Sequence, residues 1–358
     1  MTTSVRTPPV VTMPVDPRSD PGWARLAMGP RGHLFVSPPW IEAICGTYGF
    51  EPHARVRLGD DGRPVGGFAW VGLSDMLGDR TVSLPFSERV DPPVDDLDTW
   101  RAVTDEAFSL GPPVTIRVID DPDAVVLRDD RLERVGLAAW HGTPLGVPLE
   151  EIGAGISAAA RRNLRTSERK NVRVVASEGL DALRSFHELH VALRKNKYGL
   201  LAQPVELFER LWAGFAPLDG IVTLLARVDD VVVAGGVYLE WNGTLYHKFG
   251  ASRTEYRSLC PNNAVTWAAI RWACERGLDG IDWGLSDLDQ PGLVGYKRQW
   301  ASTERRIVTV RSQPVSGPGR DGLEARRLLS ELSSLFADAT VPDEITARAG
   351  GLLYRYFC

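Results

Sequence analysis

Apolar and polar positions follow clear helix and strand periods along the first third of the chain. The pattern predicts a helix at Pro39–Tyr48 and a second, with Asp95 and Asp96 at its positive end, at Asp95–Leu110. Apolar-rich stretches separated by turn residues predict strands at His53–Leu58, Pro64–Leu73, Arg80–Leu84 and Pro113–Val118.

The middle of the chain begins with a strongly basic helix, predicted at Ser157–Lys170. A strand, two helices and three strands follow, at Val172–Ala176, Leu180–Arg194, Val205–Phe215, Ile221–Val228, Val231–Glu240 and Thr244–Gly250. Asn242-Gly243 is a strong hairpin signal between the last two strands. A helix starting at Pro261, a short strand at Gly280–Trp283 and a strand near Arg305–Arg311 complete this unit.

This order of elements resembles that of the GCN5-related acetyltransferase fold, and the first third of the chain repeats a shorter form of it. Gly66-Gly67 and Gly235-Gly236 occupy the same place in the second of three consecutive strands. We therefore expect a mixed α/β (α+β) protein with tandem acetyltransferase-like domains. Each domain would have a mixed, mostly antiparallel sheet flanked by helices.

The expected divisions follow the changes in composition. We expect a disordered tail at 1–20, a degenerate N-terminal domain at 21–150 and a C-terminal domain at 151–312. Residues 313–358 would form a linker and a C-terminal helix, Leu323–Ala337, that packs back on the domains.

Composition narrows the class of protein. With 44% hydrophobic and 24% charged residues, 358 residues can form two globular domains. The net charge of −5 argues against indiscriminate nucleic-acid binding, although a local basic groove stays possible. The sequence contains no run of about 18 apolar residues, so it predicts no membrane span. No signal peptide is recognisable. The four scattered cysteines indicate neither disulfides nor a metal site. We expect a cytoplasmic monomer.

The most informative motif joins Gly280-Ile-Asp-Trp-Gly-Leu-Ser286 to Gly292-Leu-Val-Gly-Tyr-Lys-Arg-Gln-Trp300. Here the chain resembles the Fem-type (FemAB/FemX-like) peptidyl/aminoacyl transferases within the GCN5-related N-acetyltransferase superfamily. The resemblance covers roughly Ser157–Arg311, and more loosely Leu84-Pro-Phe-Ser87. It implies a two-domain acetyltransferase fold. Many members of the family extend peptidoglycan precursors with aminoacyl-tRNA, and relatives form amides in natural products.

Lys297 and Asp282 are the candidate catalytic residues. Acyl transfer to an amine passes through an oxyanion, which a cation in a dry site stabilises. Lys297 lies between Tyr296 and Trp300, and the resemblance implies this role for it. The alternative is a surface lysine whose stem covers apolar rings. Asp282 either accepts the amine proton or only caps the following loop.

Other polar and aromatic positions are candidates for binding. Substrate contacts are expected from Arg194, Lys195, Lys197, Tyr198, His247, Arg257, Asn262, Tyr296 and Trp300. Contacts to tRNA phosphates are expected from Arg161, Arg162, Arg165, Arg169 and Lys170. Both sets of cations have an alternative interpretation without a ligand. Those at 194–197 would be stabilised by the helix C-terminus, and those at 161–170 would form a solvated helix face.

The leading hypothesis is aminoacyl transfer from aminoacyl-tRNA, a co-substrate rather than a bound cofactor, to an amine acceptor. The acceptor would be a peptidoglycan precursor or another small molecule. The first alternative is N-acylation from acyl-coenzyme A. The segment 250–261 lacks the spaced glycines with which conventional acetyltransferases bind the coenzyme's pyrophosphate. The second alternative is a non-catalytic binding or regulatory protein on a degenerate acetyltransferase fold.

Overall fold

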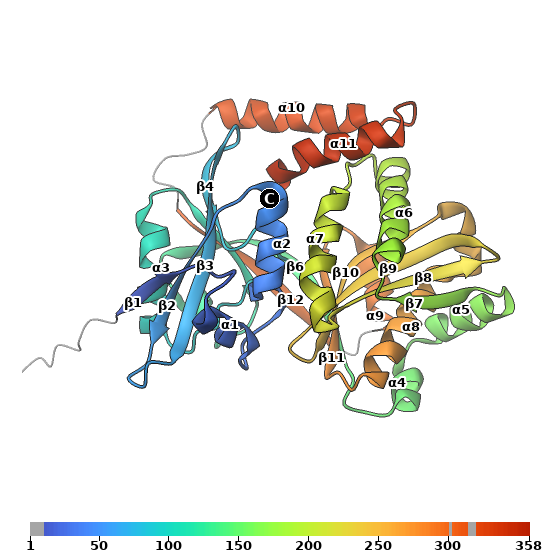
Figure 1. Ribbon diagram of the computed structural model, residues 1–358, viewed down its shortest axis with the longest axis horizontal. Helices are drawn as coiled ribbons and strands as arrows, with labels where there is room; N and C mark the ends of the chain where they lie inside the picture. Colours follow the sequence, from blue (N-terminus) through green and yellow to red (C-terminus); the bar gives the residue numbers. More distant parts are fainter. Residues whose placement is uncertain (1–10, 301–302, 314–319) are drawn as a thin grey trace, which may run out of the picture.

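A mixed sheet runs through the whole molecule in the computed structural model, which describes residues 11–300, 303–313 and 320–358 (Figure 1). Within these residues its 12 strands lie in the order β1-β2-β3-β4-β5-β12-β6-β11-β10-β9-β8-β7. The strands are β1 (Thr12–Val15), β2 (Pro52–Leu58), β3 (Pro64–Asp75), β4 (Gly78–Val82), β5 (Val114–Ile119), β6 (Leu132–Pro144), β7 (Arg173–Ser177), β8 (Ile221–Val228), β9 (Val231–Trp241), β10 (Thr244–Ser252), β11 (Gly280–Asp287) and β12 (Thr303–Ser312).

Helices connect the strands and cover both faces of the sheet. They are α1 (Pro21–Met28), α2 (Pro38–Tyr48), α3 (Leu97–Ser109), α4 (Leu149–Gly155), α5 (Ala158–Arg169), α6 (Leu180–Tyr198), α7 (Val205–Phe215), α8 (Pro261–Glu275), α9 (Pro291–Arg298), α10 (Arg320–Phe336) and α11 (Asp343–Leu353). Local signals set several ends: Asp96 caps α3 by accepting the N–H of Thr99 at 2.7 Å. Asn242 and Gly243 both have positive φ, 48° and 74°, as the predicted hairpin turn requires.

The two ends of the sheet have matching topology, which confirms the predicted tandem acetyltransferase-like fold. All neighbouring strands pair antiparallel except two short parallel pairs, β4 with β5 and β10 with β11, one in each half. In each half, one strand of the sheet comes from the other half of the sequence. β12, from the end of the chain, completes the first half beside β5, and β6 completes the second half beside β11. β6 and β12 also pair with each other. The division expected near residue 150 therefore separates two halves in sequence but not two independent sheets.

Several expectations need correction. The predicted tail is shorter than 1–20, because Thr12–Val15 pairs with β2 as strand β1 and Arg55 Nε donates to the Thr12 hydroxyl at 2.8 Å. Residues 1–10 lie outside the described residues. Strand β6 and helices α9 and α11 were not expected. Strand β11 extends four residues beyond the predicted Trp283.

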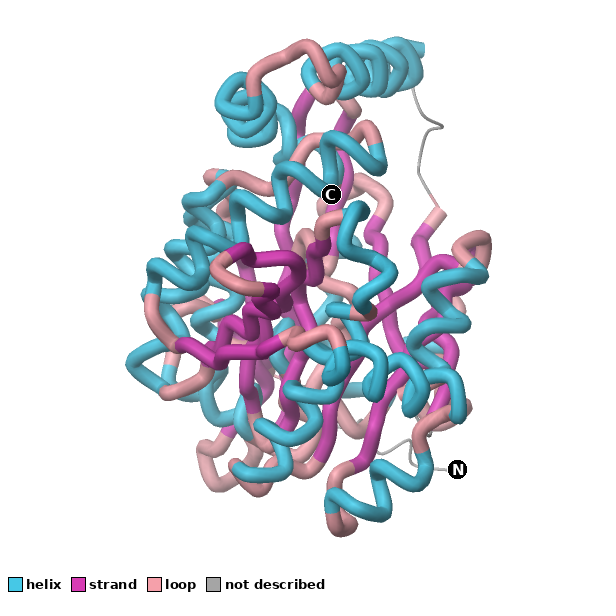
Figure 2. Tube along the Cα trace, turned by 90° about the vertical axis from the view of Figure 1, so that its right-hand side faces the viewer, coloured by secondary structure: helices cyan, strands magenta, loops and turns pink. Residues whose placement is uncertain are grey.

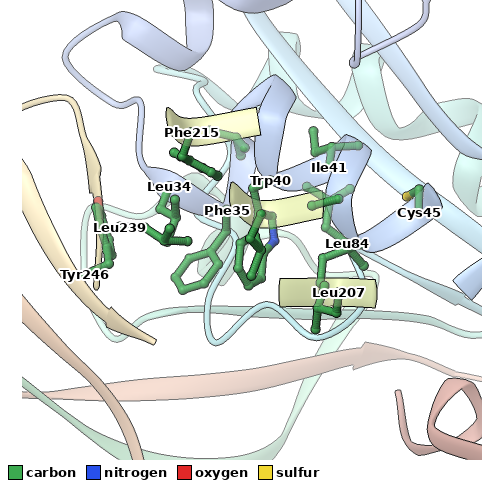
Figure 3. Packing of buried hydrophobic residues seen from close by; sticks show 14 of the residues in the cluster. Leu34, Phe35, Trp40, Ile41, Cys45, Leu84, Leu207, Phe215, Leu239 and Tyr246 are labelled. Atoms are coloured by element: carbon green, nitrogen blue, oxygen red, sulfur yellow. The ribbon is translucent and has the colours of Figure 1, made fainter. Parts of the chain in front are cut away.

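The largest core cluster joins the two halves. Figure 3 shows Phe35, Trp40 and Leu84 of the first half packed with Leu207 and Tyr246 of the second. Helices α2 and α7 lie against each other across this cluster. Burial of large aromatic and aliphatic side chains is a major source of stability, so this cluster holds the halves in a fixed relation.

The C-terminal helices lie across one end of the molecule, with α10 above the end of β4 and α11 beside α6 (Figures 1 and 2). Lys195 of α6 anchors them, because its buried ammonium donates to the Asp343 carboxylate at 2.7 Å and to the Val341 carbonyl oxygen. None of the described helices is both apolar enough and long enough to cross a bilayer.

Candidate active site

Lys297 lies near the end of α9 with its side chain turned into the protein. Only 8% of the residue is exposed. Its ammonium donates to the backbone oxygens of Gly284, at 3.1 Å, and Leu285, at 2.9 Å. Burial lowers the pKa of Lys297 to about 8, against the opposing effect of Glu88 and Asp282. The ammonium is still mostly charged at pH 7. With three N–H groups, two of which have described acceptors, it can give a third hydrogen bond to an oxyanion.

The acceptors of Lys297 lie at an irregularity in β11. The pairing of β11 with β6 shifts between Asp282 and Leu285, and Gly284 there has a φ of +76°. The Asp282 carboxylate accepts the N–H of Gly284 at 2.8 Å. This backbone turns two successive carbonyl groups toward the ammonium, which is why the glycine in the motif matters.

Asp282 is enclosed rather than open to substrate. It is 4% exposed, and an Arg89 guanidinium nitrogen lies 3.7 Å from its second oxygen. Burial raises the pKa of Asp282 above its ordinary value, although Arg89 acts in the opposite direction. Of the two interpretations of Asp282, this geometry favours a cap on the β11 irregularity over an acceptor of the amine proton.

Glu88 is a site residue that the sequence reasoning missed. It follows Leu84-Pro-Phe-Ser87, and its carboxylate accepts from Lys248 Nζ at 2.6 Å and from the N–H of Leu285 at 2.8 Å. Lys248 Nζ also lies 4.5 Å from the centre of the Phe35 ring and 4.8 Å from that of Trp40. Glu88 comes from the first half, so the site is built from both halves. Its nearness to the strand-end motif was the one signal that could have identified it.

His247 lies on β10 beside Lys248, next to the rings of Tyr238 and Trp283. Burial, with Lys297 adding to it, lowers the pKa of His247 to about 4. The imidazole is therefore neutral at physiological pH and can accept or donate a hydrogen bond near Lys297.

The predicted cluster at the end of α6 divides in the structure. Arg194 lines a pocket of about 500 Å³ with Tyr354, Leu329 and Phe357, while its Nε donates to the Leu201 carbonyl oxygen at 2.6 Å. Lys195 is instead committed to Asp343. Lys197 and Tyr198 are exposed, with the ammonium over the ring at 4.9 Å. Of these four residues, Arg194 is thus the one that lines a pocket in the described part of the chain.

The remaining predicted contacts fall into two groups. Arg257 and Asn262 are exposed at the start of α8, where Asn262 donates to the Ser252 hydroxyl at 3.2 Å. Trp300 is 3% exposed in the core, and the Tyr296 hydroxyl lies 2.8 Å from that of Thr266. These two aromatics therefore pack in the core of the second half, with ring centres 6.2 Å apart, rather than on an open binding face.

The basic helix is α5, and most of its cations point to solvent. Arg162, Arg165, Arg169 and Lys170 are exposed, and none of them forms an ion pair with a described residue. Residues 162, 165 and 169 share one helix face. Arg161 differs, because its guanidinium donates to the carbonyl oxygens of Ala154 and Ile156. Four of the five predicted cations are thus exposed, and three of them lie on one face of α5.

Comparison with known proteins adds two findings on sequence. Residues 157–298 match the family model described as an acetyltransferase (GNAT) domain. The chain is 30% identical over 92 residues to a lipid II:glycine glycyltransferase of Staphylococcus saprophyticus, and 29% identical over 91 residues to that of Staphylococcus haemolyticus. Each match covers 24% of this chain and 22% of the relative, so the chain spans about a fifth of the length of these relatives.

Solved structures extend the similarity to the whole fold. FemX has a TM-score of 0.64 at 13% identity over 83% of this chain and 96% of its own. L-PGS from Bacillus licheniformis has a TM-score of 0.55 at 13% identity over 86% of this chain and 96% of its own. The chain thus has the tandem GNAT fold, and residues 157–298 match the model of an acetyltransferase (GNAT) domain. The local sequence matches to lipid II:glycine glycyltransferases and the shared fold of FemX agree with the resemblance to Fem-type transferases drawn from the motif around Lys297.

Proposed function

We propose that this protein is an N-acyltransferase that moves an aminoacyl group from aminoacyl-tRNA to an amine acceptor. The observation that carries the proposal is the Lys297 ammonium, held in a dry site by two backbone carbonyl groups with a third N–H available. A fixed cation of this kind stabilises the tetrahedral oxyanion of acyl transfer. The similarity to lipid II:glycine glycyltransferases supports an aminoacyl donor and a peptidoglycan-precursor acceptor.

The reaction that this site would promote is aminolysis of an ester. The acceptor nitrogen attacks the ester carbonyl carbon of aminoacyl-tRNA, and the carbonyl oxygen becomes an oxyanion beside Lys297. This attack forms the C–N bond. Collapse of the intermediate then restores the carbonyl group, breaks the C–O bond to the terminal ribose and leaves the amine proton on the departing oxygen. Lys297 keeps its proton throughout, since a charged ammonium stabilises the oxyanion.

The exposed face of α5 supports tRNA as the carrier. Arg162, Arg165 and Arg169 offer cations without described acidic partners in a chain of net charge −5. Contacts of this kind bind phosphates independently of sequence. Arg194, in its pocket, is available for a phosphate or carboxylate of the acceptor.

The start of α8 does not favour a coenzyme pyrophosphate. Pro261 has no N–H, and the N–H groups of Asn263 and Ala264 both donate to the Cys260 carbonyl oxygen. Free amides at a helix N-terminus are what bind such an anion. The acyl-coenzyme A reaction is therefore the alternative against which the proposal is tested.

A transfer assay with mass-spectrometric detection distinguishes the two donors. The purified protein is incubated with amine acceptors, including peptidoglycan-precursor peptides, and either charged tRNA or acetyl-coenzyme A. We expect an aminoacylated amine with charged tRNA, none with uncharged tRNA, and about 100- to 1,000-fold slower formation with the Lys297→Met variant. Product from acetyl-coenzyme A alone would replace the proposal with its alternative.

A further inference from the structure

Glu88 comes from a segment that the first half holds firmly. After β4, Leu84 and Phe86 both have positive φ, 58° and 57°, a conformation that non-glycine residues adopt at a cost. The Ser87 hydroxyl accepts from the Trp40 indole at 3.1 Å, and the N–H of Val90 donates to the Arg117 carbonyl oxygen at 2.6 Å. The hydrogen bonds of Ser87 and Val90 therefore fix the backbone on both sides of Glu88.

The Glu88 carboxylate lies where two strands of the second half part. β10 and β11 pair only as far as Tyr246 and Asp282. Just beyond, one Glu88 oxygen binds Lys248 of β10 and the other binds the N–H of Leu285 of β11. The carboxylate thus bridges the diverging strands. The Glu88 side chain is 23% exposed, so most of it is enclosed between these strands.

Gly284 allows this close approach. A Cβ atom at Gly284 would lie 2.2 Å from Glu88 Oε2, far inside van der Waals contact, and the φ of +76° independently favours glycine. Residue 284 and Glu88 are therefore matched in shape across the two halves.

The same residue of β11 links Glu88 to Lys297. Leu285 donates its N–H to Glu88 and accepts Lys297 Nζ at its carbonyl oxygen. We propose that Glu88 is a positioning residue, which fixes the irregular backbone of β11 and thereby holds the Lys297 ammonium in place for the transfer reaction. The inference rests on the proposed function for its catalytic meaning, while the structural link between the two side chains can be tested without substrate.

Electrostatics adds to the mechanical link. Burial would raise the pKa of Glu88, but Lys248 and then Lys297 bring it below its ordinary value, so the group is an anion near neutral pH. An anion here favours the charged form of Lys297. Removing it leaves the buried ammonium less stabilised, and its pKa then falls further.

The first test is NMR titration of the lysine side chains, for which the chain offers only five lysines. Carbon-13-labelled lysine gives five Cε signals, and the one lost in Lys297→Met is assigned to Lys297. In Glu88→Gln we expect the Lys297 signal to titrate below pH 8, and in Glu88→Asp to stay near the wild-type value. Asp289→Asn, which removes an exposed carboxylate from the loop before α9, is the matched control and should leave it unchanged. If the Lys297 signal of folded Glu88→Gln titrates at the same pH as in the wild type, the proposal is wrong.

The second test reports the backbone contact. Glu88→Ala removes the carboxylate that accepts the Leu285 N–H, so hydrogen exchange of this amide should accelerate about 10-fold or more. This variant also carries the test if Glu88→Gln does not fold. Unchanged protection of the Leu285 amide would contradict the positioning role.

Activity separates this inference from the proposed function. If charged tRNA gives product, the loss of rate at high pH should move to lower pH in Glu88→Gln and return toward wild type in Glu88→Asp. An unshifted profile would contradict the inference alone. If no donor gives product but the Lys297 signal moves as expected, the proposed function fails and the link between Glu88 and Lys297 stands.

Discussion

Arg89 and Asp282 face each other from the two halves of the molecule, with a guanidinium nitrogen 3.7 Å from a carboxylate oxygen. Arg89 is itself paired with Asp91, whose second oxygen accepts the Ile119 N–H at 2.8 Å. Asp282 therefore belongs to a buried network of alternating charges. A network of this kind holds its side chains in one arrangement, and removal of one charged group leaves its buried partner without a counter-charge.

This arrangement predicts a mild kinetic effect for Asp282→Asn. The amide oxygen can still accept the Gly284 N–H, so the irregularity of β11 keeps its cap. We expect the transfer rate to stay within about 10-fold of wild type, whereas loss of a general base costs about 100- to 10,000-fold. Steady-state kinetics decides the point, and a decrease of the larger size would return Asp282 to an acid–base role.

Lys297→Met should be far more damaging. Methionine keeps the apolar stem and removes the charge, so the fold should persist, while the rate should fall about 100- to 1,000-fold with donor binding little changed. Lys297→Arg should recover only part of the rate, because the guanidinium is larger and planar. Single-turnover kinetics with circular dichroism as a check on folding is the measurement. A folded methionine variant with more than about a tenth of wild-type turnover is incompatible with the role.

The lowered pKa of Lys297 also predicts a pH dependence of stability. Between pH 8 and 10.5 the unfolded chain keeps a proton that the folded protein has lost. Raising the pH through this window therefore favours the folded state, and below pH 8 the cost of burying the charge is fully present. Urea unfolding should show the free energy of unfolding rising across the window relative to Lys297→Met, a comparison that cancels other titrating groups. Parallel curves would rule the effect out.

Arg162→Glu combined with Arg165→Glu should weaken binding of charged tRNA. Each lost phosphate contact reduces the slope of log K against log salt by about 1, so the slope should become shallower as well. Arg63→Glu combined with Arg327→Glu, two exposed arginines outside α5, is the charge-matched control. Filter binding at several salt concentrations provides the measurement, and equal losses in the double variant and the control would remove α5 from the tRNA site.

Lys195→Met should loosen the C-terminal helices without affecting the core. The change removes the buried bonds to Asp343 and Val341 and leaves the Asp343 carboxylate without its cation. Hydrogen exchange across 320–353 should accelerate, while β8 and β9 stay protected. Lys197→Met, two residues along on the exposed side of the same helix end, is the matched control. Unchanged exchange in both variants would show that other contacts hold the helices.

Periodicity predicted most of the second half because its elements are long and locally consistent. The helix at 205–215 and the strand at 221–228 match the structure at both ends. Strand β6 was missed, since Gly136 and Gly142 interrupt its apolar positions and its first part is largely exposed. Helix α9 was missed because Gly292 and Gly295 lower its intrinsic propensity, and packing of Val294 and Lys297 stabilises it instead.

The site could be predicted only where its residues are close in sequence. Asp282 and Lys297 belong to one motif, so their nearness was expected. Glu88 reaches the same place through the tertiary fold, 197 residues before Leu285. Lys195 looked like a ligand for substrate, but a carboxylate at residue 343 occupies it, a contact that no local pattern reveals.

Because β6 and β12 are exchanged between the halves, folding of the first half depends on a strand that is synthesised late. The first half cannot close its sheet until β12 inserts beside β5, where the Val114 N–H donates to the Ser312 hydroxyl 198 residues along the chain. At about 5–20 residues per second, the ribosome needs about 10–40 s to synthesise that distance. Throughout this interval β5 and β6 present unpaired edges, which are templates for strands of other chains. Yield on refolding should therefore fall with protein concentration, and β12 inserted into a second copy would give a domain-swapped dimer.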